Sequence, residues 1–195
     1  MPRVTEAYRT ARRDEIIAAA LRCFAEKGYQ RTSMADIIEE SGLSAGAIYG
    51  HFAGKQELFA AVAGRVLDAR AGELEAMRGS GDPPSPGRII ATLLDGMRRE
   101  PFSGVLLQLW AEAVIDPAIR EQVQQVLGRL KATLHARLAE WAAVPGHVEG
   151  DPEAWAARAV PVVIGLGPGF IVQRALVDGF DEDAYLRALP ELLPH

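Results

Sequence analysis

Hydroxyl and basic side chains gather in one short stretch of the chain, residues 31–55, at spacings that suit contact with phosphate groups. Thr32, Ser33 and Ser44 stand at or just before the expected starts of two short helices. Hydroxyl groups and backbone N–H groups at helix N-termini bind phosphate oxygens well. The sequence therefore predicts a phosphate-contacting surface on this stretch.

No set of residues typical of an enzyme accompanies this surface. The histidines at 51, 135, 147 and 195 lack the spacing of metal ligands, and Cys23, the one cysteine, has no histidine at a suggestive distance. The chain also has no glycine-rich phosphate loop. We therefore expect no catalytic residue, no metal site and no cofactor.

Two short helices joined by a tight turn are expected to position the hydroxyl groups. Ser33 is a good N-cap with Asp36 three residues later, and it opens a helix over roughly 34–40. Gly42 lies just past that helix, where a left-handed residue is usual, and Ser44 caps a second short helix through Tyr49. This pattern predicts a helix-turn-helix, whose second helix enters the DNA major groove.

The same residues resemble the DNA-binding domain of tetracycline-repressor-type (TetR-family) transcription regulators. The family pattern runs Gly-Tyr-x-x-Thr-Ser-x-x-x-Ile, then Gly-Val-Ser-x-Gly-x-x-Tyr-x-His-Phe-x-x-Lys. This chain matches it at Gly28, Tyr29, Thr32, Ser33, Ile37, Gly42, Ser44, Gly46, Tyr49, His51, Phe52 and Lys55, with Leu43 in place of Val. The resemblance implies backbone contacts to DNA from Thr32, Ser44, Tyr49, His51 and Lys55.

The solvent face of the expected recognition helix departs from a typical base-reading surface, because it carries no Arg, Asn or Gln. Ala47 suits contact with a thymine methyl group, and Gly50 permits close approach of the backbone. We expect specificity to come mainly from Arg31, from the arginine-rich N-terminus and from DNA shape. The complete expected DNA-binding set is Arg31, Thr32, Ser33, Ser44, Ala45, Gly46, Ala47, Tyr49, Gly50, His51 and Lys55.

Composition favours an all-helical protein, since 49% of the 195 residues are hydrophobic and long β-branched alternating stretches are absent. The net charge of −5 is unevenly spread: residues 1–55 carry +1 and the remainder −6. The N-terminus lacks the apolar segment of a signal peptide. The longest uncharged run, 159–173, contains two prolines and is short for a membrane span. We expect a cytoplasmic protein without a membrane segment.

Helical periodicity and turn signals predict about nine helices in two domains. Residues 1–55 are expected to form a three-helix DNA-binding domain. Residues 56–195 are expected to form a helical ligand-binding and dimerisation domain. The expected helices cover 10–27, 34–40, the segment around Ile48 and Tyr49, 55–79, 88–99, 102–114, 117–143, 152–179 and 182–193.

The resemblance implies that this second domain binds a small molecule and a second copy of the chain. Gly165, Gly167 and Gly169 would let the eighth and ninth helices of two chains approach closely as a four-helix homodimer interface. A pocket for an unknown effector is expected among the fourth to eighth helices. Its candidate residues are Met97, Phe102, Leu106, Gln108, Trp110, Leu134, His135, Phe170 and Gln173.

These features together favour a dimeric transcriptional repressor that binds a palindromic double-stranded DNA operator and is released by a small molecule. One alternative is a small-molecule-binding or enzymatic helical protein whose DNA-binding motif is vestigial; the alanine- and glycine-rich recognition helix favours it. A transcriptional activator is a further alternative.

Overall fold

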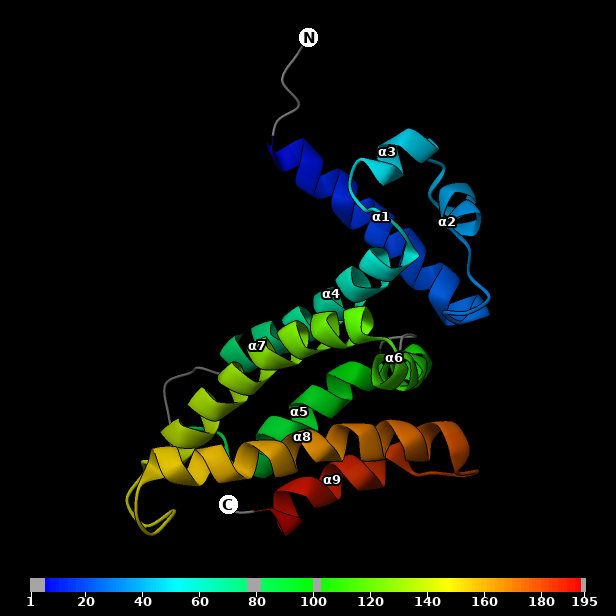
Figure 1. The fold of residues 1–195 in the computed structure, drawn as a ribbon. Coiled ribbons are helices and arrows are strands. Elements are labelled where there is room, and N and C mark those ends of the chain that lie inside the picture. The colour runs from blue at the N-terminus through cyan, green and yellow to red at the C-terminus, as the bar shows by residue number, and fades with distance from the viewer. Residues whose placement is uncertain (1–5, 77–81, 100–102, 194–195) are drawn as a thin grey trace. The chain divides into compact units, whose positions relative to one another are not determined.

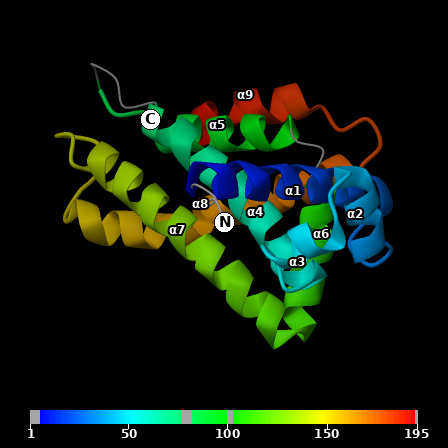
Figure 2. The same cartoon turned by 90° about the horizontal axis from the view of Figure 1, so that it is seen from above.

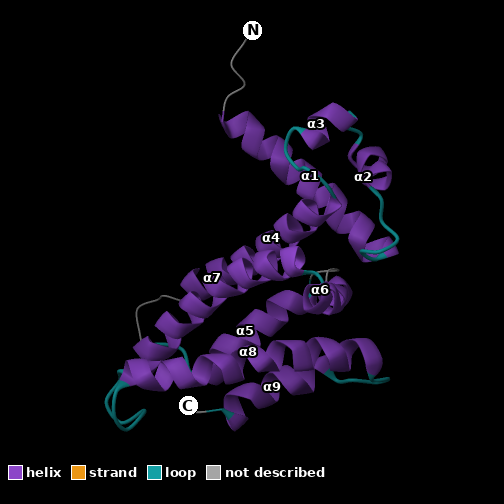
Figure 3. Ribbon diagram, in the orientation of Figure 1, coloured by secondary structure: helices purple, strands orange, loops and turns teal. Residues whose placement is uncertain are grey.

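The computed structural model describes residues 6–76, 82–99 and 103–193. Over these residues the chain forms nine α-helices and no strand (Figures 1 and 3), which confirms the all-α fold class. The helices are α1 (Glu6–Lys27), α2 (Met34–Ser41), α3 (Ala45–Tyr49), α4 (Lys55–Ala76), α5 (Pro86–Arg98), α6 (Ser103–Ile115), α7 (Pro117–Ala142), α8 (Pro152–Leu176) and α9 (Glu182–Leu192).

The starts of α8 and α9 agree with the expected helix starts, whereas the start of α1 and the end of α8 do not. Asp151 and Asp181 cap α8 and α9 with their carboxylates. Helix α1 begins at Glu6 rather than near Thr10, and α8 ends at Leu176, where Val177 is already extended. The expected end of the fourth helix, residues 77–79, lies outside the described residues.

The described chain divides into two compact units that do not coincide with the two expected domains. The first unit contains residues 1–65 and 104–123, and the second contains residues 66–103 and 124–195. Helices α4 and α7 therefore each contribute to both units, while α6 belongs to the first. The expected boundary between residues 55 and 56 separates a DNA-binding function from ligand binding and dimerisation. This boundary stays a prediction.

The core of the first unit is built on the apolar stripe of α1. Ile16, Ile17 and Phe24 are fully buried, as helical spacing predicts. The Phe24 ring meets the Phe59 ring edge-on at 4.9 Å, and Tyr29 lies 4.3 Å from Phe59 between ring centroids. Aromatic contacts of this kind fix α1 against the start of α4.

In the second unit, α5 packs against α9 and α8 (Figures 1 and 2). The contact with α9 is closest at Gly87, which is buried. A β-carbon at this position would lie 2.5 Å from the Leu189 carbonyl oxygen and 2.5 Å from the Pro190 α-carbon. Only glycine allows the two backbones to approach this far. At the other end of α5, Arg98 pairs with Asp183 at 2.5 Å.

Replacing Gly87 with alanine should lower the free energy of unfolding by about 1–3 kcal/mol, because the added methyl group meets rigid backbone atoms. The matched control is Gly128→Ala in α7, where an added β-carbon meets nothing within 4 Å. That change should raise the free energy of unfolding by about 0.5–1 kcal/mol through helix propensity. Urea denaturation measures both values; equal stabilisation by the two changes would contradict the close approach of α5 and α9.

Candidate nucleic-acid interface

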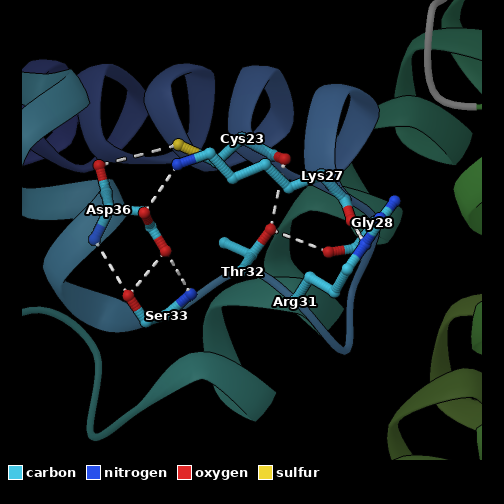
Figure 4. A network of polar contacts seen from close by, with 7 residues as sticks. All are labelled: Cys23, Lys27, Gly28, Arg31, Thr32, Ser33 and Asp36. Carbon is cyan, nitrogen blue, oxygen red and sulfur yellow. Dashed lines mark hydrogen bonds and ion pairs between the residues drawn. The ribbon is translucent and has the colours of Figure 1, made fainter.

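Local hydrogen bonds define the start of α2 (Figure 4), and a left-handed glycine defines its end. The Ser33 hydroxyl accepts from the Asp36 backbone N–H at 3.1 Å, and the Asp36 carboxylate accepts from the Ser33 backbone N–H at 2.7 Å. This reciprocal pair is a complete capping box. Gly42 closes α2 at φ 67°. The predicted caps of the helix-turn-helix are therefore confirmed.

The carboxylate of Asp36 also fastens α2 to α1. Lys27 Nζ donates to Asp36 Oδ1 at 2.6 Å (Figure 4). This bond and the two bonds from Ser33 hold the pKa of the Asp36 carboxyl well below its ordinary value. On the same helix pair, the Cys23 thiol donates to the Asp36 carbonyl, and burial raises the pKa of Cys23. This thiol is consequently a packing group rather than a reactive one.

The turn between α1 and α2 is held from within by Thr32. Its side chain is only 1% exposed, and its oxygen lies 2.8 Å from the Gly28 carbonyl oxygen and 3.1 Å from that of Cys23 (Figure 4). The hydroxyl therefore donates within the protein. This placement argues against the phosphate contact expected from Thr32, and we leave this residue out of the proposed DNA surface.

Both backbone polar groups of Tyr29 are held by side chains from distant parts of the chain. The Tyr29 N–H donates to Gln108 Oε1 of α6 at 2.9 Å, and the Tyr29 carbonyl accepts from Lys55 Nζ of α4 at 2.9 Å. The Lys55 ammonium also lies 4.4 Å from the centre of the Tyr29 ring, a cation–π contact. We call this set of contacts the Tyr29 clamp.

Two further hydrogen bonds join the elements beside the Tyr29 clamp. The Gln30 side-chain amide donates to the Glu112 carboxylate on α6. Gln56 Nε2 donates to Asp116 Oδ2, just after α6, at 3.0 Å. Helix α6 is therefore fixed to the turn before α2 and to the first turn of α4. Sequence reasoning missed this role of Gln108, which had been expected to orient an effector.

The second short helix presents a small, mostly apolar surface. The Ser44 hydroxyl accepts from the Ala47 N–H at 3.2 Å, and Ile48 is fully buried beneath the helix. The Tyr49 side chain is 52% exposed. The other exposed members of the predicted DNA-binding set are Arg31, Ser33, Ser44, Ala45, Gly46 and Gly50, and the half-buried members are Ala47, His51 and Lys55.

Basic residues of α1 add to this surface. Helix α1 carries Arg9, Arg12 and Arg13, so these residues form part of a helix rather than a free arm. The Arg13 guanidinium lies 5.2 Å from the centre of the Phe52 ring. Its positive charge is therefore close to the short segment after α3 that contains His51 and Phe52. Arg12 instead bonds to Tyr8 and Glu15. Arg13 was not among the expected site residues, since its contact depends on packing between separate helices.

The residues expected to line an effector pocket fall into different units. Leu106, Gln108 and Trp110 belong to the first unit. Met97, Leu134, His135, Phe170 and Gln173 belong to the second, and Phe102 lies outside the described residues. A pocket formed jointly by these residues stays a prediction.

Individual members of this set have defined surroundings. Trp110 lines an open hollow of about 380 Å³ with Ala113, Val114 and Arg120, all in the first unit. Phe170 is fully buried against Phe180 and Tyr185, which favours a core role over contact with a ligand. Of the residues in the expected set, Trp110 thus lies at an open surface depression.

Polar members of the set in the second unit have partners of their own. His135 Nδ1 lies 3.6 Å from the Glu153 carboxylate, and the Gln173 amide donates to the Gly169 carbonyl at 3.3 Å.

Helix α8 is the one described helix that is long and apolar enough to cross a membrane. The uncharged run within it is shorter, but the whole helix has 25 residues. Length and composition alone are weak evidence, because core helices of globular proteins pass the same test. No group of three or more histidine, cysteine, aspartate or glutamate side chains suited to a metal ion occurs among the described residues.

Replacing Asp36 with asparagine should lower the thermal stability at neutral pH and should matter less in acid. Because the pKa of Asp36 is lowered in the folded state, its stabilising contribution is present above the unfolded pKa of about 3.9. The contribution declines as the pH falls below this unfolded value toward the folded one, so part of it is lost at pH 3. Thermal unfolding of wild type, Asp36→Asn and the surface control Asp178→Asn at pH 7 and pH 3 measures the effect. A gap between wild type and Asp36→Asn that stays constant with pH would contradict the assigned ion pair.

Comparison with known proteins agrees with this geometry. The family model described as bacterial regulatory proteins, tetR family, matches residues 16–62, and the model of the BetI-type transcriptional repressor C-terminal region matches residues 87–194. The HTH-type transcriptional repressor AcnR of Corynebacterium diphtheriae is 34% identical over 141 residues, which cover 67% of this chain and 74% of the relative.

Solved structures share the fold at lower identity. GusR of Salmonella enterica has a TM-score of 0.69 at 24% identity and covers 97% of this chain and 98% of its own. FadR of Bacillus subtilis, solved in complex with stearoyl-CoA, has a TM-score of 0.71 at 18% identity and covers 93% and 97%. With the helix-turn-helix and its caps in place, these matches identify the chain as a DNA-binding transcriptional regulator that belongs to the tetR family and carries a BetI-type C-terminal region.

Proposed function

We propose that this regulator is a homodimeric, cytoplasmic repressor that binds a palindromic operator and is released by a small-molecule effector. The observation that carries the proposal is the exposure of Ala45, Gly46 and Tyr49 on α3, which is held on a helix-turn-helix with capped helix starts and a bonded entry turn. An exposed surface on such a motif suits docking into the major groove.

Contacts to the phosphate backbone would come from the rim of this surface. Tyr49 and Arg31 are exposed, and Ser33 and Ser44 stand at the starts of α2 and α3. Lys55 is half-buried, and its ammonium group donates to the carbonyls of Tyr29 and Gln30. An ammonium group has three N–H donors, so one remains for contact with a phosphate. Arg13 adds positive charge next to residues 51 and 52. These groups position the protein on DNA without reading its sequence.

A second copy of the chain is the proposed partner of α8. Val162, Val172 and Leu176 are exposed apolar residues on this helix, and Leu176 is 75% exposed. Together with Gly165 and Gly169 they fall at alternating steps of three and four residues, which places all five on one face. An added β-carbon at either glycine meets nothing within 4 Å in the described chain, so the space above this face is open to a partner helix.

Helix α9 contributes Leu192, which is 81% exposed, to the same proposal. Two α8–α9 pairs packed as a four-helix interface would cover both sets of apolar side chains. Burial in such a dimer accounts for the apolar character of α8 without a membrane.

The effector is the least defined partner. The open hollow beside Trp110 combines an aromatic wall with the cation of Arg120, which already donates to the Ala113 carbonyl at 2.9 Å. FadR of Bacillus subtilis was solved with stearoyl-CoA, which supports a small-molecule effector for this chain in general terms. Such an effector releases DNA only by binding the DNA-free state more tightly, so effector and operator must weaken each other's binding by the same factor.

The test combines DNA binding with dimerisation. Selection from a random-sequence duplex library should enrich an inverted repeat with half-sites centred on successive major grooves, and binding should weaken with added salt. Leu176→Asp should give a monomer in light scattering and lower the affinity for the selected duplex about 100-fold, because the two half-sites no longer act together.

The control for this change is Ile115→Asp, an equally exposed apolar residue of the first unit that does not line the Trp110 hollow. It should leave the dimer intact and the affinity within about twofold. Failure to enrich any sequence would contradict DNA binding. A dimer that survives Leu176→Asp would contradict the α8 interface and leave DNA binding in place.

A further inference from the structure

The base-facing part of the interface is almost without hydrogen-bonding side chains. Residues 45–50 read Ala-Gly-Ala-Ile-Tyr-Gly, and only Tyr49 among them carries a polar side chain. Ile48 is buried, which leaves Ala45, Gly46 and Ala47 as the first residues of α3 toward solvent. In helix-turn-helix proteins these N-terminal residues of the second helix contact base edges.

The polar side chains that flank α3 are already bonded within the motif. The Ser41 hydroxyl donates to the Ile38 carbonyl at 3.0 Å and accepts from the Leu43 N–H at 3.3 Å. The Ser44 oxygen caps α3 through Ala47. On α2, Glu40 pairs with Arg22. None of these groups extends the base-reading capacity of α3.

The chemistry of base edges decides what such a surface can recognise. Guanine is read by Arg or Lys at its O6 and N7 atoms, and adenine by Asn or Gln at N6 and N7, whereas the C5-methyl group of thymine is read by apolar contact. Ala45 and Ala47 offer only methyl groups. Gly46 lies between them, and a β-carbon added there would meet nothing within 4 Å. Because Gly46 has no side chain, the backbone of α3 can come close to the base edges.

We propose that α3 recognises thymine C5-methyl groups through Ala45 and Ala47 and does not read the guanine edge. The inference rests on the proposed DNA-binding function and specifies its substrate: half-sites with thymine under α3, in which α3 makes no contact with guanine N7. Preference for such half-sites comes from burial of methyl groups and from DNA shape.

The test uses wild-type protein and a duplex that it has selected from a random-sequence library. Each thymine of a half-site is replaced in turn by deoxyuridine, which removes the methyl group and keeps base pairing. Each guanine is replaced by 7-deazaguanine, which removes the N7 acceptor. At one or more positions deoxyuridine should weaken binding about fourfold, the value for burying one methyl group. In an Arg31→Ala protein, which lacks the exposed arginine before α2, the 7-deazaguanine duplexes should bind as the parent duplex does.

A double-mutant cycle then assigns the methyl contact to α3. If Ala47 or Ala45 buries the thymine methyl, Ala47→Gly or Ala45→Gly should remove most of the deoxyuridine effect at its own position. Ala136→Gly, at an exposed site of α7, is the control and should leave that effect unchanged. Circular dichroism and thermal unfolding establish that each glycine variant is folded before it is compared.

The possible results separate this inference from the function on which it rests. If no sequence is enriched, the proposed function and the inference both fail. If a sequence is enriched and deoxyuridine has no effect at any position, or 7-deazaguanine weakens the binding of Arg31→Ala, the inference alone is wrong. A deoxyuridine effect that persists in both glycine variants would also overturn the assignment to α3.

Discussion

The arrangement of the DNA-binding unit depends on the backbone of one residue, Tyr29, whose two flanking peptide groups are both held by side chains. Its N–H is bonded by Gln108 of α6 and its carbonyl by Lys55 of α4, each at 2.9 Å. Because Tyr29 follows the left-handed residue Gly28 at the end of α1, these two bonds fix the direction in which the chain leaves that helix. Thr32 then holds the rest of the turn, and the capping box of Ser33 and Asp36 begins α2. The contacts of Tyr29, Thr32 and the capping box together position α2 and leave α3 exposed.

The Tyr29 clamp also explains why α6 is part of the first compact unit although it lies far along the chain. Helix α6 starts at Ser103, where the chain leaves the second unit. The chain passes between the two units three times: within α4, at the first residue of α6 and within α7. Two of these three connections lead directly into elements of the clamp. The hollow beside Trp110, the proposed effector site, lies on α6 itself, the helix that carries Gln108 of the clamp.

The sequence predicted the local features well and the long-range contacts poorly, for a physical reason. The caps at Ser33, Gly42 and Ser44 depend on residues two or three positions away, so their spacing was visible directly. The roles of Thr32 and Gln108 could not be predicted in this way. Gln108 bonds a residue 79 positions away. The Thr32 hydroxyl turns inward because the α1 carbonyls of Cys23 and Gly28 come close in the fold. Apolar periodicity identified α8 as exceptional, and exposure at Val162, Val172 and Leu176 showed which face is uncovered.

Amide hydrogen exchange tests the importance of the Tyr29 clamp most directly. In Gln108→Ala the Tyr29 N–H loses its acceptor, so exchange at Tyr29 and through α2 and α3 should accelerate roughly tenfold while α9 stays unchanged. Gln108→Glu keeps an acceptor oxygen at the same place and should retain the wild-type protection. Unchanged exchange at Tyr29 and in α2 and α3 of Gln108→Ala would contradict the view that the bonded backbone of Tyr29 holds the DNA-binding surface in place.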